Sequence, residues 1–166
     1  TLDRSSAASD VYKRQTLLTA TWSPDAGVVV TSSVLPMAWT RALERIGRDL
    51  RVRHFNGAIA DIRFEAEHRQ VRDDDELDYV WLSSDVTPEG GVSHGMAHSG
   101  EGVLASAGEE AVAVSCANLV QDQVERTGIQ WPRGRAGGAM GAVLIGGVAT
   151  WSGRDGEKAA IGSLPA

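Results

Sequence analysis

The sequence predicts an α+β domain, in which an antiparallel sheet of several hairpins packs against two helices. Turn residues separate short β-prone runs at several points, which is the pattern of hairpins. Apolar residues also recur at helical spacing in two segments, about residues 35–47 and 107–127. The chain has 166 residues, 42% of them hydrophobic, which is enough for one ordinary core.

The N-terminal residues 1–15 are excluded from this prediction. The stretch SSAASDVYKRQ (residues 5–15) resembles the in-frame translation of a common transposase sequencing adapter. Such a segment is foreign to the fold, and we expect it to be disordered. Residues 16–166 therefore form the predicted single domain, which we expect to be truncated at its N-terminus.

The first predicted elements are a strand pair and a helix. The runs TLLTATW (16–22) and VVVT (28–31) flank the turn cluster SPDAG, so we expect them to pair. The first helix follows, with Ser33 as its N-cap and Pro36 in its first turn. Gly47 is expected to end it through a left-handed C-cap. Its apolar stripe comprises Leu35, Trp39, Ala42, Leu43, Ile46 and Leu50.

Asn56-Gly57 gives the best local signal in the chain, because these residues readily adopt the positive φ angles of a two-residue hairpin turn. The flanking runs LRVRHF and AIADIRFEAE are predicted to pair, with Val52 opposite Asp61. Residues 77–82 follow an acidic turn and are apolar on both faces from Tyr79 onward. This pattern predicts a central strand.

The second half of the chain begins with a glycine-rich loop, TPEGGVSHGMAHSGEG (residues 87–102). The longest predicted helix follows it, with capping-box spacing at Ser106 and Glu109 and with Gly128 at the C′ position. The run VLI-GG-VATW predicts a second hairpin. The turn GRDGEK and a short strand, AAIGSL, complete the chain.

Charge and cysteine content argue against several classes of protein. A net charge of −6 disfavours nucleic-acid binding, and no run approaches the 18 apolar residues that would span a membrane. Cys116 is the single cysteine, so no internal disulfide forms. Its apolar helical surroundings predict a buried, unreactive thiol. This cysteine usage is typical of a reducing compartment, so we expect a cytoplasmic location.

The loop at residues 90–102 holds the candidate chemistry. Gly91 to Gly95 match the G-x-S-x-G pattern, but the flanking strand and helix of a nucleophile elbow are missing from the sequence pattern. His94 and His98 have the spacing of helical zinc ligands, yet the nearby glycines disfavour a helix and no third ligand is evident. We therefore predict no metal and no cofactor. His94, Met96 and His98 are instead candidate binding residues.

Five tryptophans are many for a domain of this size. The helix and strand patterns assign Trp39 and Trp81 to the core. Trp131 and Trp151 lie among glycines, and we expect them to be partly exposed. An exposed tryptophan pair beside an acidic face suits a protein partner, so both are candidate binding residues.

From Asn118 onward the sequence resembles a group of uncharacterised small bacterial proteins. The matching parts are VQDQV (120–124), Trp131-Pro132, the strand ending in Trp151, Asp155-Gly156 and Ile161-Gly162. In those proteins the pattern runs W-P-x-C-P-x-H and then W-x-C-P, which is similar to a zinc-ribbon knuckle. This chain has Gly134, Gly137 and Gly153 at the ligand positions, so zinc is not carried over. The resemblance implies a bacterial origin and an interaction role.

The sequence contains no complete catalytic constellation, and no catalytic residue is assigned. Our first hypothesis is a small, acidic, non-enzymatic domain that binds a protein or peptide in a regulatory or accessory role. The alternative is a hydrolytic or metal-dependent enzyme that uses the loop at 90–102. In it His94 and His98 would be metal ligands or a base, Ser93 or Ser99 a polar contact, and the Asp73–Asp75 turn an acid. A third reading is a fragment whose missing N-terminus holds the function. Oligomeric state is left open.

Overall fold

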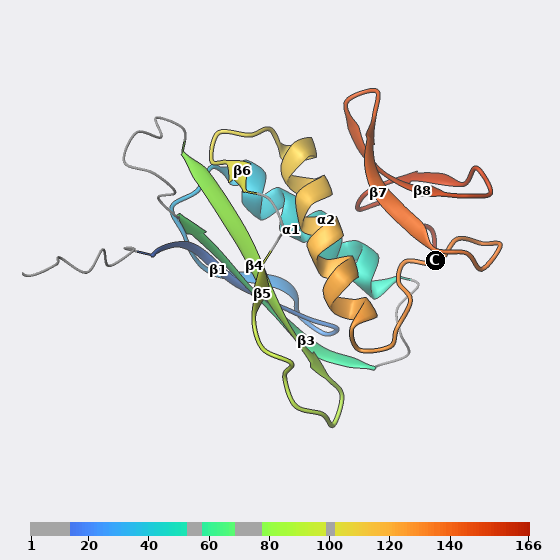
Figure 1. Cartoon of the computed structure of the whole chain (residues 1–166), viewed down its shortest axis with the longest axis horizontal. Helices are drawn as coiled ribbons and strands as arrows, with labels where there is room; N and C mark the ends of the chain where they lie inside the picture. The colour runs from blue at the N-terminus through green and yellow to red at the C-terminus, as the bar shows by residue number, and fades with distance from the viewer. Residues whose placement is uncertain (1–13, 53–57, 69–77, 99–101) are drawn as a thin grey trace, which may run out of the picture.

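The computed structural model describes residues 14–52, 58–68, 78–98 and 102–166. It has the predicted α+β architecture (Figure 1). The larger sheet contains β1 (Gln15–Ser23), β2 (Gly27–Ser33), β3 (Ile59–His68), β4 (Tyr79–Pro88), β5 (Ala97–His98) and β6 (Val103–Leu104). The smaller sheet contains β7 (Met140–Ile145), β8 (Val148–Gly153) and β9 (Lys158–Ala160). The helices are α1 (Met37–Arg51) and α2 (Glu109–Glu125).

Neighbouring strands are antiparallel in both sheets. The larger sheet has the order β2-β1-β3-β4-β5, with β6 also paired to β4, and the smaller sheet has the order β7-β8-β9. The predicted first hairpin is confirmed by the pairing of β1 with β2. Of the adapter-like segment, only Arg14 and Gln15 are described, and Gln15 opens β1 opposite His68.

Both helices lie on one face of the larger sheet, and the smaller sheet lies on the other side of α2 (Figure 1). Val80, Leu82 and Val86 of β4 are buried in the core that the helices cover. Because successive side chains of a strand point to opposite faces, Ser83 and Asp85 point away from the helices. We call this second face of the larger sheet the open face.

Helix α1 begins at Met37 and continues to Arg51, several residues beyond its predicted end. Ser33 is not its N-cap: the Ser33 hydroxyl accepts the N–H of Leu35 ahead of the helix, and Pro36 takes the N-cap position. The helix passes through Gly47, so the prediction that Gly47 ends it is wrong.

Gly47 serves close packing rather than termination. A Cβ at this position would lie 2.6 Å from Cγ2 of Val28 and 3.1 Å from Cδ1 of Trp22. The indole N–H of Trp22 also donates to the Gly47 carbonyl over 3.0 Å. The glycine therefore lets α1 approach the first hairpin more closely than any side chain would allow.

The predicted hairpin across Asn56-Gly57 is wrong in its pairing. Leu50 and Arg51, expected at the start of a strand, belong to α1, because Leu50 completes the buried stripe of that helix. Strand β3 instead lies between β1 and β4, so Asp61 is opposite Thr87 and not Val52. The turn residues themselves fall outside the described part of the chain.

The remaining elements follow the prediction with small shifts. The expected central strand is β4, which extends beyond residue 82 and lies between β3 and β5. Helix α2 has Gly108 at its N-cap with no side-chain cap, so the expected capping box of Ser106 and Glu109 does not form. Gly128 has a left-handed φ of 84°, but the C-cap of α2 is Arg126, so Gly128 lies one residue beyond the C′ position predicted for it. Gly146 and Gly147, with φ of 57° and 79°, close the predicted hairpin between β7 and β8.

Neither α1 nor α2, the two helices of the described residues, is long and apolar enough to cross a membrane.

Candidate binding surfaces

The loop between β4 and β5 is fastened to the open face of the larger sheet. The Ser93 hydroxyl donates to the Asp85 carboxylate, with distances of 2.5 and 2.6 Å to its two oxygens. The same hydroxyl accepts the N–H of Gly95 over 3.1 Å. Arg63, which lies opposite Asp85 on β3, forms an ion pair with this carboxylate. These contacts hold the middle of the loop against β4.

The Asp85 side chain is only 1% exposed, but its charge is well compensated. Burial alone raises the pKa of a carboxyl, because it disfavours the charged form. The hydrogen bond from Ser93, and then the hydrogen bond and charge of Arg63, outweigh burial and bring the pKa of Asp85 below its usual value of 3.8. Asp85 therefore stays ionised at neutral pH and acts as an anchor for the loop.

His98 fastens the other end of the loop. It lies opposite Ser83 in the pairing of β5 with β4, and its Nδ1 is 2.5 Å from the Ser83 hydroxyl oxygen. Ser83 is only 1% exposed whereas His98 is exposed, so this cross-strand contact joins a buried hydroxyl to a surface imidazole. The structure thus brings the predicted residue His98 to a serine that the sequence analysis did not select.

His94 and Met96 lie on the outward side of the same loop. Val92 is 83% exposed, Met96 is 40% exposed, and His94 is also exposed. His94 and His98 are not on a helix. The described residues contain no group of three His, Cys, Asp or Glu side chains that could hold a metal ion.

The nucleophile-elbow pattern at Gly91 to Gly95 does not form an elbow. The Ser93 hydroxyl is hydrogen-bonded to Asp85. The next element after Ser93 is the short strand β5, whereas a nucleophile elbow needs a helix there. Ser99 and the acidic turn Asp73–Asp75, which the enzyme hypothesis would use, lie outside the described residues.

The expectation that Trp131 and Trp151 are partly exposed is wrong. Trp131 is 1% exposed and Trp151 is 0% exposed. Their rings pack edge to face, with centroids 5.3 Å apart and an interplanar angle of 78°. Burial of so much aromatic surface outweighs the glycine-rich surroundings. These two residues therefore form a core for the C-terminal strands and offer no surface to a partner.

Cys116 is fully buried, as predicted. Burial in apolar surroundings raises the pKa of its thiol to about 12. The thiolate is therefore scarce at neutral pH, and the residue is structural.

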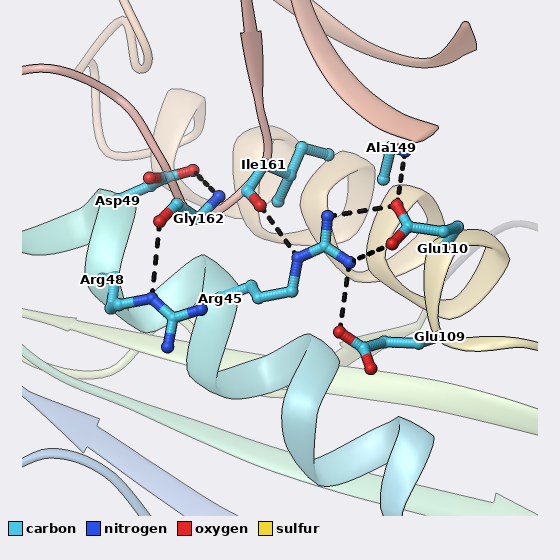
Figure 2. A network of polar contacts seen from close by, with 8 residues as sticks. All are labelled: Arg45, Arg48, Asp49, Glu109, Glu110, Ala149, Ile161 and Gly162. Atoms are coloured by element: carbon cyan, nitrogen blue, oxygen red, sulfur yellow. Dashed lines mark hydrogen bonds and ion pairs between the residues drawn. The ribbon is translucent and has the colours of Figure 1, made fainter. Parts of the chain in front are cut away.

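A polar network joins α1, α2 and the C-terminal strands (Figure 2). The Arg45 guanidinium makes a two-pronged contact with Glu110, at 2.7 and 3.1 Å, and a single contact with Glu109 at 3.2 Å. Its Nε donates to the Ile161 carbonyl over 2.8 Å. Glu110 also accepts the N–H of Ala149 over 2.6 Å. The hydrogen bond from Arg45 lowers the pKa of Glu110.

Asp49 is the second anchor of the C-terminal segment. Its carboxylate accepts the indole N–H of Trp151 at 2.7 Å and the backbone N–H groups of Gly162 and Leu164 at 2.6 and 3.0 Å. Burial raises the pKa of Asp49, and the three hydrogen bonds offset only part of this effect. Without this carboxylate, the three N–H groups that donate to it would lose their hydrogen-bond acceptor.

Sequence reasoning missed Arg45 and Asp49, although a signal was available. The two residues are four apart, next to Ile46 and Leu50 on the buried side of α1, and both are buried themselves. Charged residues inside an apolar stripe point to partners elsewhere in the fold, because an unpaired buried charge is costly. The partners are more than 60 residues away in the chain, so the sequence does not identify them.

The hairpin of β7 and β8 exposes aliphatic side chains on both of its faces near its turn. Val143, Leu144, Ile145 and Val148 are 42%, 50%, 37% and 44% exposed. No charged residue occurs between Arg135 and Arg154, although the chain as a whole is acidic. We call these four side chains the hairpin patch. In Figure 1 the connection between β7 and β8 lies clear of both helices.

The outer edge of β7 carries unused backbone groups beside the hairpin patch. At the base of the strand, the N–H of Met140 donates to the Pro132 carbonyl over 3.1 Å, and Gln121 donates to the Met140 carbonyl over 2.5 Å. Both groups therefore point away from β8. Because the pattern repeats every second residue, Ala142 and Leu144 also direct their N–H and C=O groups outward. Within the described residues no strand pairs with this edge.

No protein-family model matches the chain, and comparisons with curated proteins and with solved structures give no match.

Proposed function

We propose that this domain is a non-enzymatic binding module that takes up an extended segment of polypeptide by strand addition at the outer edge of β7. The observation that carries the proposal is the combination, at one place, of unpaired backbone groups at Ala142 and Leu144 with the exposed side chains of the hairpin patch. Main-chain hydrogen bonds give affinity in this mode of recognition, and alternate side chains give selectivity.

Packing and hydrogen bonds hold the base of the hairpin to the rest of the fold, which favours binding at its end without rearrangement of the base. Trp131 packs against Trp151 of β8, whose indole N–H donates to Asp49. Glu110 accepts the backbone N–H of Ala149, also on β8. The side chains of β7 on the α2 side become more exposed toward the turn: Met140 is 1% exposed, Ala142 is 8% exposed and Leu144 is 50% exposed. The helices therefore cover the base of the hairpin and leave its end accessible.

Strand β2, the edge of the larger sheet, is less suited to this role. Its final residues Thr31, Ser32 and Ser33 are exposed and polar, and a bulge interrupts its pairing with β1. Polar side chains and bulges are the devices by which edge strands avoid pairing. Strand β7 has neither of them beside Val143.

The partner segment is expected to be uncharged and aliphatic, because the hairpin patch offers no charge to a charged side chain. The net charge of −6 also favours a protein over a nucleic acid as the partner, because nucleic-acid binding requires positive charge to neutralise the phosphates. We place the module in the cytoplasm, since its one cysteine is a buried thiol.

A labelled peptide tests strand addition directly. The probe carries residues 139–146 with lysines added for solubility, and its matched control is methylated on the amides of the two residues that pair. Fluorescence anisotropy should show saturable binding of the probe to the chain and none of the control. Equal binding of both peptides, or no binding of either, would contradict the proposal.

Hydrolysis is the second candidate function, because the Ser83 hydroxyl and His98 Nδ1 are 2.5 Å apart. In such a pair the imidazole takes the serine proton as the oxygen attacks a carbonyl. A fluorophosphonate probe tests it on the wild type, S83A and S93A. Labelling that S83A alone abolishes would support a hydrolase. The absence of labelling, or its persistence in S83A, would remove this candidate.

A further inference from the structure

We propose that the segment taken up at the β7 edge is β7 of a second copy of this chain, so that two protomers join their smaller sheets across a two-fold axis. This inference rests on the proposed strand addition and specifies its partner. Two features of β7 favour a copy of itself, its register and the space beside it, and the absence of charge along the hairpin permits the contact.

The register of β7 is self-complementary. Ala142 and Leu144 each direct one N–H and one C=O outward, with Val143 between them. In an antiparallel pair, Ala142 of one protomer can exchange both hydrogen bonds with Leu144 of the other, and the reverse exchange follows by symmetry. Val143 then faces its own copy at the axis. Every outward backbone group of these two residues gains a partner.

The side chains also fit this register. Val143 and Ile145 lie on the side of β7 away from α2, and Ile145 of one protomer would lie opposite Gly141 of the other. A Cβ added at Gly141 would meet nothing within 4 Å, so space for the isoleucine is open. Val143 at the axis gives a β-branched pair, which favours cross-strand packing.

The charge distribution permits contact between two acidic chains. Each chain carries a net charge of −6, which by itself opposes self-association. The stretch between Arg135 and Arg154 holds no charged side chain, so the two hairpins meet without like charges opposite each other. Pairing of two short strands buries less area than a standard stable interface, so we expect a dimer that forms with rising concentration.

Sedimentation equilibrium of the full chain tests this pairing. The wild type should approach twice the chain mass of 17.6 kDa as the concentration rises. V143K and V143D each place like charges together at the axis and should weaken the dimer by about tenfold or more. An equal mixture of V143K and V143D should dimerise again, because lysine then meets aspartate. V29K is the matched control, since Val29 is a similarly exposed valine on β2.

Other outcomes identify which step fails. A wild type that remains monomeric up to about 1 mM, while the β7 peptide still binds, overturns self-pairing and leaves strand addition in place. A monomeric chain that binds no peptide overturns both proposals. A dimer that withstands V143K, or one that V29K disrupts, places the interface elsewhere and overturns self-pairing. V143T, an uncharged β-branched replacement, should retain the dimer and so attributes the effect of V143K to its charge, while recovery in the V143K and V143D mixture shows that both charged variants are folded.

Discussion

The indole N–H of Trp151 donates a hydrogen bond of 2.7 Å to the carboxylate of Asp49, and this contact joins β8 to α1 across 102 positions of the chain. The same carboxylate holds Gly162 and Leu164 through their backbone N–H groups. Asp49 therefore fixes both the strand behind the proposed binding edge and the C-terminal residues that follow it. The edge of β7 is presented by a scaffold whose orientation is determined by buried polar contacts.

Replacing Asp49 tests this anchoring role. In D49N the amide NH₂ group would face N–H donors that the carboxylate now accepts, so we expect a loss of about 1–3 kcal/mol in the free energy of unfolding. Urea denaturation measures the change. Burial already raises the pKa of Asp49, so the substitution also removes a disfavoured charge. Unchanged or increased stability would show that relief of this charge outweighs the lost hydrogen bonds.

Arg45 and Glu110 should be energetically coupled. The two-pronged contact of 2.7 and 3.1 Å is partly buried, with the Arg45 side chain 10% exposed and the Glu110 side chain 38% exposed. A double-mutant cycle of R45M and E110Q should give a coupling energy of about 1–2 kcal/mol. Additive effects of the two substitutions would mean that the pair contributes nothing beyond its separate contacts.

Adding a methyl group at Gly47 should destabilise the protein. Alanine is favoured over glycine inside a helix by about 1 kcal/mol, so propensity alone predicts a gain. The added Cβ, however, would lie 2.6 Å from Val28 and 3.1 Å from Trp22, which forces α1 away from the first hairpin. Thermal unfolding should show a lower midpoint for G47A, with partial recovery in G47A/V28A. A more stable G47A would contradict the tight packing.

Asp85 should contribute stability that depends on pH. Its pKa in the folded protein lies below the usual 3.8, so the ionised carboxylate stabilises the fold above that value. This contribution is lost as the pH falls through 3.8 toward the lower folded-state pKa. D85N should therefore be less stable than the wild type at pH 7, and the gap should narrow as the pH falls below about 4. A gap that stays constant in urea titrations between pH 7 and pH 3 would contradict this account.

The fold class was predictable because its signals are local. The glycine pair at 146–147 and the apolar spacing of both helices lie within single elements, and each produced the expected structure. The sequence predictions were wrong where contacts between residues far apart in the chain determine the local structure. Gly47 resembles a helix end in the sequence, but its role depends on Val28. In the sequence, Leu50 is compatible with a strand as well as a helix. In the structure it belongs to α1, because its side chain packs in the core that this helix covers.

The candidate site was predictable only in part, for the same reason. The loop bearing His98 was selected from its composition, whereas its contacts with β4 depend on strand pairing. Trp131 and Trp151 were misplaced because glycine-rich surroundings do not reveal which face of a sheet is covered. The edge of β7 is identified only when the strand order is known, since exposed backbone groups leave no trace in side-chain patterns.

Hydrogen exchange at the β7 edge tests strand addition most directly. The amides of Ala142 and Leu144 should exchange more slowly as the protein concentration rises, because a second strand then protects them. The Met140 amide, already bonded to the Pro132 carbonyl, serves as an internal reference and should not change. If Ala142 and Leu144 exchange at the rate of exposed amides even where the mass has doubled, pairing at β7 is contradicted.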